Sequence, residues 1–244
     1  MGRVSEAAVR PIPRRGRIRV ILLLAVFLFG LGYLVYAIAT LKPGDPTVHV
    51  SGIGDAQQLF GGVPQEGDRL GSDDAPVTIQ VFNDIQCAAC REDFLSTMPT
   101  LAEDYARPGD VKLLYRHYSN SENVEQLGFF GAEAAAEQGY GWQFIYLFFR
   151  SQAEAGHFGV DQEFLESIAG GIEELNFPEW KEDMEKNINT NGPIAQRLAA
   201  DEDLGSGLGI RVRQAAILTG PNGTRTLQDG PSLAQMERAI EEVQ

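Results

Sequence analysis

Few side chains of this 244-residue chain can bind a transition metal, because it contains only two cysteines and three histidines. His49, His117 and His157 are scattered and have no metal-site spacing to the cysteines. The sequence also lacks a glycine-rich phosphate-binding loop and a dinucleotide-binding fingerprint. The glycines of 205–209 lie between a predicted helix and a predicted strand, which is the wrong context for either motif. The sequence therefore predicts neither a metal centre nor a nucleotide-binding site.

Positive charge is scarce outside the N-terminal segment. Residues 1–40 hold six of the 20 basic residues and one of the 34 acidic residues, which leaves 14 basic against 33 acidic residues in the rest of the chain. A body with this excess of negative charge repels nucleic acid and anionic lipid. We therefore expect no nucleic-acid partner.

Residues 20–41 form an uncharged run that, as a helix, is about 33 Å long and can cross a bilayer. Four arginines lie just before it and only Lys42 follows closely. The positive-inside rule predicts a basic cytoplasmic tail over 1–19, a transmembrane helix over 20–41 and an extracytoplasmic body. A cleaved signal peptide is the alternative, because Ala37-Ile38-Ala39 resembles a cleavage site, although signal peptides usually have shorter apolar regions. Both alternatives place the body in an oxidising compartment.

The two cysteines are three residues apart, in Cys87-Ala88-Ala89-Cys90. An apolar, β-rich run at 77–82 precedes them, and a helical stretch from Arg91 to Tyr105 follows. Backbone N–H groups and the dipole at a helix start stabilise a thiolate, which is the species that attacks a disulfide. A structural disulfide is the alternative, but a bridge that closes so short a loop contributes little stability. The motif therefore favours redox chemistry.

The chain around the cysteines has a β-α-β pattern. Residues 42–74 are rich in Gly, Pro and Asp and are predicted to be an extracytoplasmic linker, with a short strand near 48–50. Within 75–122, strands are predicted at 77–82 and 111–116 on either side of the helix. This order favours a parallel pair of strands with a right-handed crossover.

The second half of the chain is predicted to be a helical block followed by a β-β-α unit. Residues 123–204 have helical patterns throughout, and the aromatic run 142–149 is expected in the core of this block. Residues 205–244 then return to strand patterns. Their predicted elements are strands at 209–212, 215–219 and 224–227, a hairpin turn at 220–223 and a closing helix over 232–243 with Ser232 as N-cap.

With these elements in place, the chain resembles the DsbA-like thioredoxin-fold family. The resemblance rests on the closing hairpin and helix and on Ala75-Pro76-Val77-Thr78-Ile79, Phe82, Asp84, Cys87 and Cys90. It covers residues 70–244 and implies an α/β fold, namely a thioredoxin fold in two parts, 75–122 and 205–244, with an inserted α-helical domain over 123–204. Here a transmembrane helix would precede that fold. The resemblance also implies that Cys87 is the exposed nucleophile and Cys90 the buried resolving thiol.

One family feature is missing, because no proline lies between Pro193 and Pro221. The family has a cis-proline loop before its third strand, and Arg213 and Gln214 take that position here. The resemblance implies that these two residues face the disulfide and bind substrate. A cis bond without proline costs about 3–4 kcal/mol, so we expect a trans or strained loop and altered substrate docking. This departure motivates an alternative function, a redox-weak peptide-binding or chaperone-like module.

The residues near the cysteines predict a moderate redox strength. Strongly oxidising relatives often have a proline and a histidine between the cysteines, whereas Ala88-Ala89 offers no cation to stabilise the thiolate. Arg213 can lower the thiol pKa if it lies near Cys87, and is otherwise a solvated surface arginine. Asp84 is expected to hydrogen-bond the turn before the helix, with a proton relay as the alternative.

Sequence and resemblance together predict a membrane-anchored, extracytoplasmic thiol-disulfide oxidoreductase. The resemblance implies exchange with cysteines of secreted or cell-envelope proteins through a mixed disulfide on Cys87. It also implies a membrane redox partner that resets the disulfide, and no bound cofactor.

Overall fold

The computed structural model describes residues 27–28, 30–31, 50–119, 127–152, 160–188, 192–212 and 214–244. The chain separates into two units, 1–47 and 48–244. The four described residues of the first unit are helical and lie within the predicted span 20–41, the rest of which is outside the described residues. Among the residues described, no helix has the length and apolar character needed to cross a membrane.

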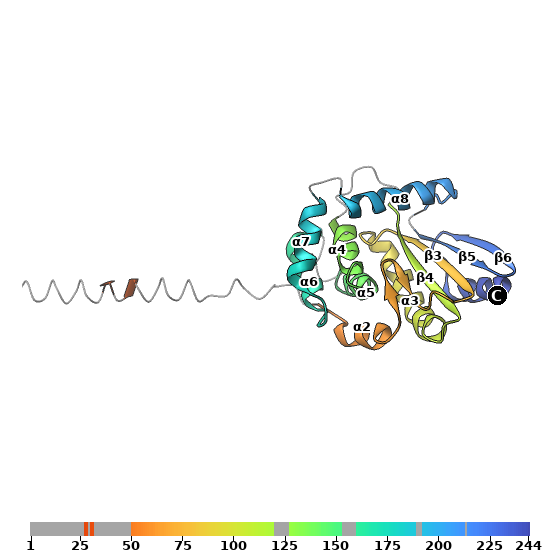
Figure 1. The fold of residues 1–244 in the computed structure, drawn as a ribbon, viewed down its shortest axis with the longest axis horizontal. Coiled ribbons are helices and arrows are strands. Elements are labelled where there is room, and N and C mark those ends of the chain that lie inside the picture. The colour runs from red at the N-terminus through yellow and green to blue at the C-terminus, as the bar shows by residue number, and fades with distance from the viewer. Residues whose placement is uncertain are drawn as a thin grey trace, which may run out of the picture. The chain divides into compact units, whose positions relative to one another are not determined.

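The described strands of the second unit form one six-stranded sheet with the order β1-β2-β4-β3-β5-β6, of which β3 to β6 are labelled in Figure 1. The strands are β1 (Gln65–Glu66), β2 (Arg69–Leu70), β3 (Val77–Asn83), β4 (Val111–His117), β5 (Gln214–Gly220) and β6 (Gly223–Gln228). β3 and β4 pair in parallel, as the sequence predicted, and the other neighbours pair antiparallel. The C-terminal end of β3 therefore lies between the end of β4 and the start of β5, where the cysteines follow.

Helix α3 (Ala88–Thr100) follows β3 and continues as a π-helical segment, η1 (Leu101–Ala106). The predicted helix to Tyr105 is thus present but changes its hydrogen-bond pattern near Pro99. Proline has no N–H and its ring crowds the preceding turn, which disturbs the regular ladder at this point.

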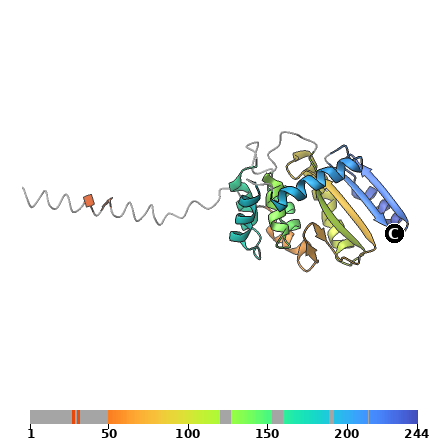
Figure 2. The same cartoon turned by 45° about the horizontal axis from the view of Figure 1, so that its top comes forward.

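Five helices form the described part of the block that the sequence predicted to be helical. They are α4 (Leu127–Ala136), α5 (Gly141–Ser151), α6 (Gln162–Gly170), α7 (Phe177–Ile188) and α8 (Pro193–Gly207), and we call them the helical insert. The last helix, α9 (Leu233–Val243), begins after Ser232 as predicted, and the Ser232 N–H donates to Gln235 Oε1. Figure 2 shows α8 passing over one face of the sheet, with α9 behind it.

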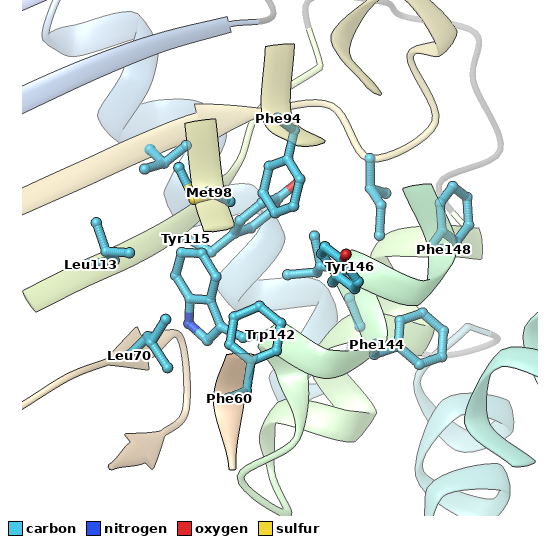
Figure 3. Packing of buried hydrophobic residues seen from close by; sticks show 14 of the residues in the cluster. Phe60, Leu70, Phe94, Met98, Leu113, Tyr115, Trp142, Phe144, Tyr146 and Phe148 are labelled. Atoms are coloured by element: carbon cyan, nitrogen blue, oxygen red, sulfur yellow. The ribbon is translucent and has the colours of Figure 1, made fainter. Parts of the chain in front are cut away.

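The main core joins the sheet, α3 and the helical insert. Side chains of α3 and α5 meet those of the sheet in one continuous cluster (Figure 3). Trp142 is 1% exposed, packs edge-on against Tyr115 with ring centroids 5.8 Å apart, and donates from Nε1 to the Asp68 carbonyl. The prediction that the aromatic run of 142–149 lies in the core is confirmed.

Two local predictions are wrong. Residues 53–70, expected in a linker, form α2 (Ile53–Phe60), β1 and β2, and both Phe60 and Leu70 are buried. Their elements are too short to show a periodic pattern. The predicted strand at 209–212 is absent because these residues end α8: Gly209 has φ +74° and the Ile210 N–H donates to the Gly205 carbonyl. Of the strand predicted near 48–50, only Val50 is described, and it is not in a strand.

Candidate functional site

A disulfide joins Cys87 and Cys90 at the start of α3, directly after β3. Cys87 is the N-cap residue, with an extended backbone (φ −80°, ψ 106°), and the Cys90 N–H donates to both its carbonyl (3.0 Å) and its Sγ (3.3 Å). The first turn of α3 contains no acidic residue. The Cys87 sulfur therefore lies where backbone N–H groups and the helix dipole favour negative charge.

The two sulfur-bearing residues differ in exposure. Cys87 is partly exposed and is followed by exposed Ala88 and Ala89, whereas Cys90 is 2% exposed. A thiolate of another protein can therefore reach Cys87 but not Cys90. This asymmetry is what a nucleophile and a resolving thiol require.

The residues before Cys87 form a hydrogen-bonded turn, and we call 84–90 the disulfide loop. Asp84 is 2% exposed, and its Oδ1 accepts a hydrogen bond from the Gln86 N–H (2.9 Å). Its carbonyl accepts from the Cys87 N–H (3.0 Å). The prediction that Asp84 hydrogen-bonds this turn is confirmed.

The helical insert contacts the disulfide loop at Gln86. The Gly128 N–H of α4 donates to Gln86 Oε1 (2.9 Å), and Gln152 Nε2, just after α5, donates to the Gln86 carbonyl (3.2 Å). Sequence reasoning missed both contacts. They join positions 42 and 66 residues apart, and no local pattern marks such a pairing.

Gln214 also contacts the disulfide loop, from the first position of β5. Its Nε2 donates to the Cys90 carbonyl (2.9 Å), and its own carbonyl accepts from the Gly230 N–H (3.2 Å). Arg213 lies outside the described residues, so its predicted place near the disulfide stays a prediction. No peptide bond between described residues is cis. The substrate-binding role of Gln214 also stays a prediction, although the residue does lie beside the cysteine pair.

A second polar region joins β4, the β1–β2 turn, α4 and α8, and sequence reasoning missed it. This charged cluster consists of Asp68, Arg116, His117, Glu133, Arg197 and Asp201. His117 Nε2 lies 3.1 Å from Glu133 Oε1, and Arg197 Nε lies 2.7 Å from Glu133 Oε2. A cavity of about 300 Å³ borders the cluster. The one local sign of this cluster in the sequence is Glu133, a single glutamate within the alanine-rich helix α4.

The charged cluster shifts carboxyl pKa values in both directions. Burial raises the pKa of Glu133, but the bonds from His117 and Arg197 outweigh it and hold that pKa at about 2. Burial raises the pKa of Asp68 and Asp201 despite the attraction of Arg116 and His117. Among the described residues, no three His, Cys, Asp or Glu side chains are grouped so that they could hold a metal ion.

Comparison with known proteins gives concordant matches. A family model described as Thioredoxin matches residues 65–194. The chain is 25% identical over 154 residues to a probable disulfide bond formation protein D of Bacillus anthracis, covering 62% of this chain and 69% of the relative. It is 24% identical over 175 residues to a protein of the same description from Bacillus cereus, covering 70% and 76%.

Solved structures with a similar fold include oxidised BdbD from Bacillus subtilis. That comparison has a TM-score of 0.59 at 19% identity and covers 74% of this chain and 96% of the other. Alpha-DsbA1 from Wolbachia pipientis has a TM-score of 0.59 at 16% identity and covers 77% and 95%. At these identities the two structures show a shared α/β fold with a helical part.

Proposed function

The chain belongs to the DsbA-like thioredoxin-fold family of protein thiol-disulfide oxidoreductases, and from that premise we propose that it works outside the cytoplasm, anchored by residues 20–41. Its clients would be secreted or cell-envelope proteins with cysteines. A membrane redox partner would reset the Cys87–Cys90 disulfide after each cycle.

The observation that carries this proposal is the partly exposed Cys87, whose sulfur accepts from the Cys90 N–H at the start of α3. A client thiolate attacks Cys87 Sγ, the Cys87–Cys90 bond breaks, and Cys90 leaves as a thiolate that takes up a proton. A second client thiolate then attacks the client sulfur of the mixed disulfide and releases the Cys87 thiolate. The client is oxidised by two electrons and the cysteine pair is reduced by two.

The test is oxidative refolding of a reduced client by full-length protein in detergent. With oxidised glutathione as the terminal oxidant, Cys87→Ser should reduce catalysed refolding to the uncatalysed rate. In Cys90→Ser, glutathione forms a disulfide with Cys87, a client thiolate attacks Cys87 Sγ and releases glutathione, and the client mixed disulfide should accumulate on a non-reducing gel. Ser96→Ala, on the exposed side of the same helix, is the matched control and should refold the client at the wild-type rate. Unchanged refolding by Cys87→Ser would contradict the proposal.

We also propose that the pair is a milder oxidant than the strongest family members, because Ala88-Ala89 supplies no cation beside Cys87. A redox titration against glutathione measures this directly. A potential as high as about −120 mV, typical of a strong oxidant, would contradict it.

Anchoring and orientation have a separate test. The uncharged run of 20–41 and the arginines before it support a cytoplasmic N-terminus. After mild reduction of intact cells, a membrane-impermeant maleimide should label Cys87. In a variant without native cysteines, Ser5→Cys should be labelled only after the cells are permeabilised. Labelling of Ser5→Cys in intact cells would reverse the proposed orientation.

A further inference from the structure

Gln86, immediately before Cys87, is held at three of its polar groups. Its N–H donates to Asp84 Oδ1 (2.9 Å), its Oε1 accepts from the Gly128 N–H (2.9 Å), and its carbonyl accepts from Gln152 Nε2 (3.2 Å). The first bond is local, whereas the other two come from the helical insert. The insert therefore holds the residue that precedes the reactive sulfur.

The peptide unit between Gln86 and Cys87 is fixed at both of its polar atoms. The Cys87 N–H donates to the Asp84 carbonyl (3.0 Å), and the Gln86 carbonyl, on the opposite edge of the same planar unit, accepts from Gln152. The orientation of this plane fixes the position of the Cys87 Cα, from which the side chain extends. Because Cys87 Sγ accepts from the Cys90 N–H (3.3 Å), a rotation of the plane would move the sulfur relative to that donor.

The contact with α4 leaves little space for movement. Gly128 is near the start of α4, where backbone N–H groups have no partner within the helix, and Gln86 Oε1 supplies one. A Cβ at Gly128 would lie 3.2 Å from Gln86 Cγ and 3.1 Å from Ile85 Cγ2. A side chain at this position would therefore require these neighbours to shift by a few tenths of an ångström.

We propose that Gln152 is a positioning residue that acts through the Gln86–Cys87 peptide to hold the Cys87 sulfur against the N-terminal N–H groups of α3, and that it thereby couples the helical insert to thiolate formation. The inference rests on the proposed reaction at Cys87. Gln152 is a neutral amide, so its contribution is geometric. Loss of its donor should lower the thiolate fraction of Cys87 without adding or removing a charge.

The test is the pH dependence of Cys87 alkylation in reduced, full-length protein, quantified by mass mapping of each cysteine. Gln152→Met keeps the side-chain length but removes the donor. We expect its Cys87 thiol pKa to rise, so that alkylation below the wild-type pKa slows about threefold to tenfold, the size of one net hydrogen bond. The rate at high pH, where the thiol is fully ionised, should equal that of wild type.

Gln86→Met is the second variant, because it removes the bond to Gly128 and leaves Gln152 intact. It should shift the thiol pKa in the same direction, which tests the coupling of the insert to Cys87 through Gly128. If Gln152→Met does not fold, Gln152→Leu removes the same donor. Gln138→Met is the matched control. That glutamine joins two parts of the insert through Asn176, so its loss should lower stability and leave the pKa of Cys87 unchanged.

The outcomes separate this inference from the proposed function. Wild-type pH profiles in both Gln152→Met and Gln86→Met, with normal client refolding, would reject the positioning role and leave the proposed function standing. An equal shift in Gln138→Met would also reject it, because any loss of stability would then move the pKa. A Cys87 that is not alkylated at any pH in the wild type would reject both.

Discussion

The disulfide loop and the charged cluster are both polar contact regions of the helical insert, but they use different chemistry. Around the disulfide loop, the side chains that donate from other elements are the amides of Gln152 and Gln214. In the charged cluster, Arg116 and Arg197 form ion pairs with carboxylates, and His117 hydrogen-bonds the buried Glu133. Neutral amides hold backbone in place without adding charge, whereas the ion pairs make part of the stability depend on pH.

This difference suits the reaction that we propose. A carboxylate brought against Cys87 by another element would raise the thiol pKa, and a fixed cation would make the pair a stronger oxidant. Contacts through amides position the loop while its redox strength is set by the start of α3. The buried ion pairs are placed instead at the contact between α4, α8 and β4, where Arg197 also pairs with Glu137. The buried carboxylate within the disulfide loop, Asp84, accepts a hydrogen bond from the Gln86 N–H.

The largest expected effect on stability comes from Glu133→Ala. The change leaves His117 and Arg197 without their shared acceptor, and should lower the free energy of unfolding by about 3 kcal/mol. Client refolding per folded molecule should stay within about twofold of wild type, because the disulfide loop does not use this contact. Urea unfolding and client refolding measure the two quantities. Glu137→Ala, which removes only the exposed partner of Arg197, is the control. A tenfold loss of refolding in Glu133→Ala would show that the charged cluster affects activity as well as stability.

Acidification should lower the free energy of unfolding by a comparable amount. Because the pKa of Glu133 is held at about 2 in the folded protein against 4.5 in the unfolded chain, its ionised form contributes about 3 kcal/mol above pH 4.5. That contribution is lost as the pH falls from 4.5 to about 2. The stability difference between wild type and Glu133→Gln should therefore shrink as the pH falls from 4.5 to about 2. A difference that is unchanged at pH 3 would contradict the assigned ion pairs.

Gln214→Met, which removes an amide contact of the disulfide loop, should have a smaller effect on stability. Loss of the bond to the Cys90 carbonyl should cost about 1 kcal/mol and lower Tm by about 2–4 °C, as measured by calorimetry. The kcat for client oxidation should change less than threefold. A rise in KM for a cysteine-containing peptide, with kcat unchanged, would instead support the substrate-binding role predicted for Gln214.

The smallest effect is expected from Glu242→Gln, a surface reference for both regions. Glu242 pairs with Arg225 at 2.6 Å, but both side chains are about half exposed. Such pairs contribute little, so unfolding free energy should change by less than about 0.5 kcal/mol and not vary with salt beyond that range. If Glu242→Gln lowered the unfolding free energy as much as Glu133→Ala, burial would not explain why the charged cluster contributes more than a surface pair.

Several features could be predicted because their signals are local. The apolar, β-rich run of 77–82 marks β3, the alternation of 111–116 marks β4, and the turn at 220–223 marks the final hairpin. The spacing of Cys87 and Cys90 after a strand marks the reactive loop. The strand predicted at 209–212 is absent for a physical reason. The N–H groups of Gly209 and Ile210 donate to carbonyls at the end of α8, so they do not pair with a neighbouring strand.

The amino-acid sequence alone determined the order of β3, α3, β4, the helical insert, β5, β6 and α9. It also determined the thiol pair and its place at a helix start, because each of these depends on residues close together in the chain. Only the tertiary structure decided that Gln152 and Gly128 hold Gln86, that Gln214 contacts Cys90, and that Glu133 is buried between His117 and Arg197. Those partners are distant along the chain, and each amide or carboxylate could equally be solvated until packing brings a complementary group within hydrogen-bond distance.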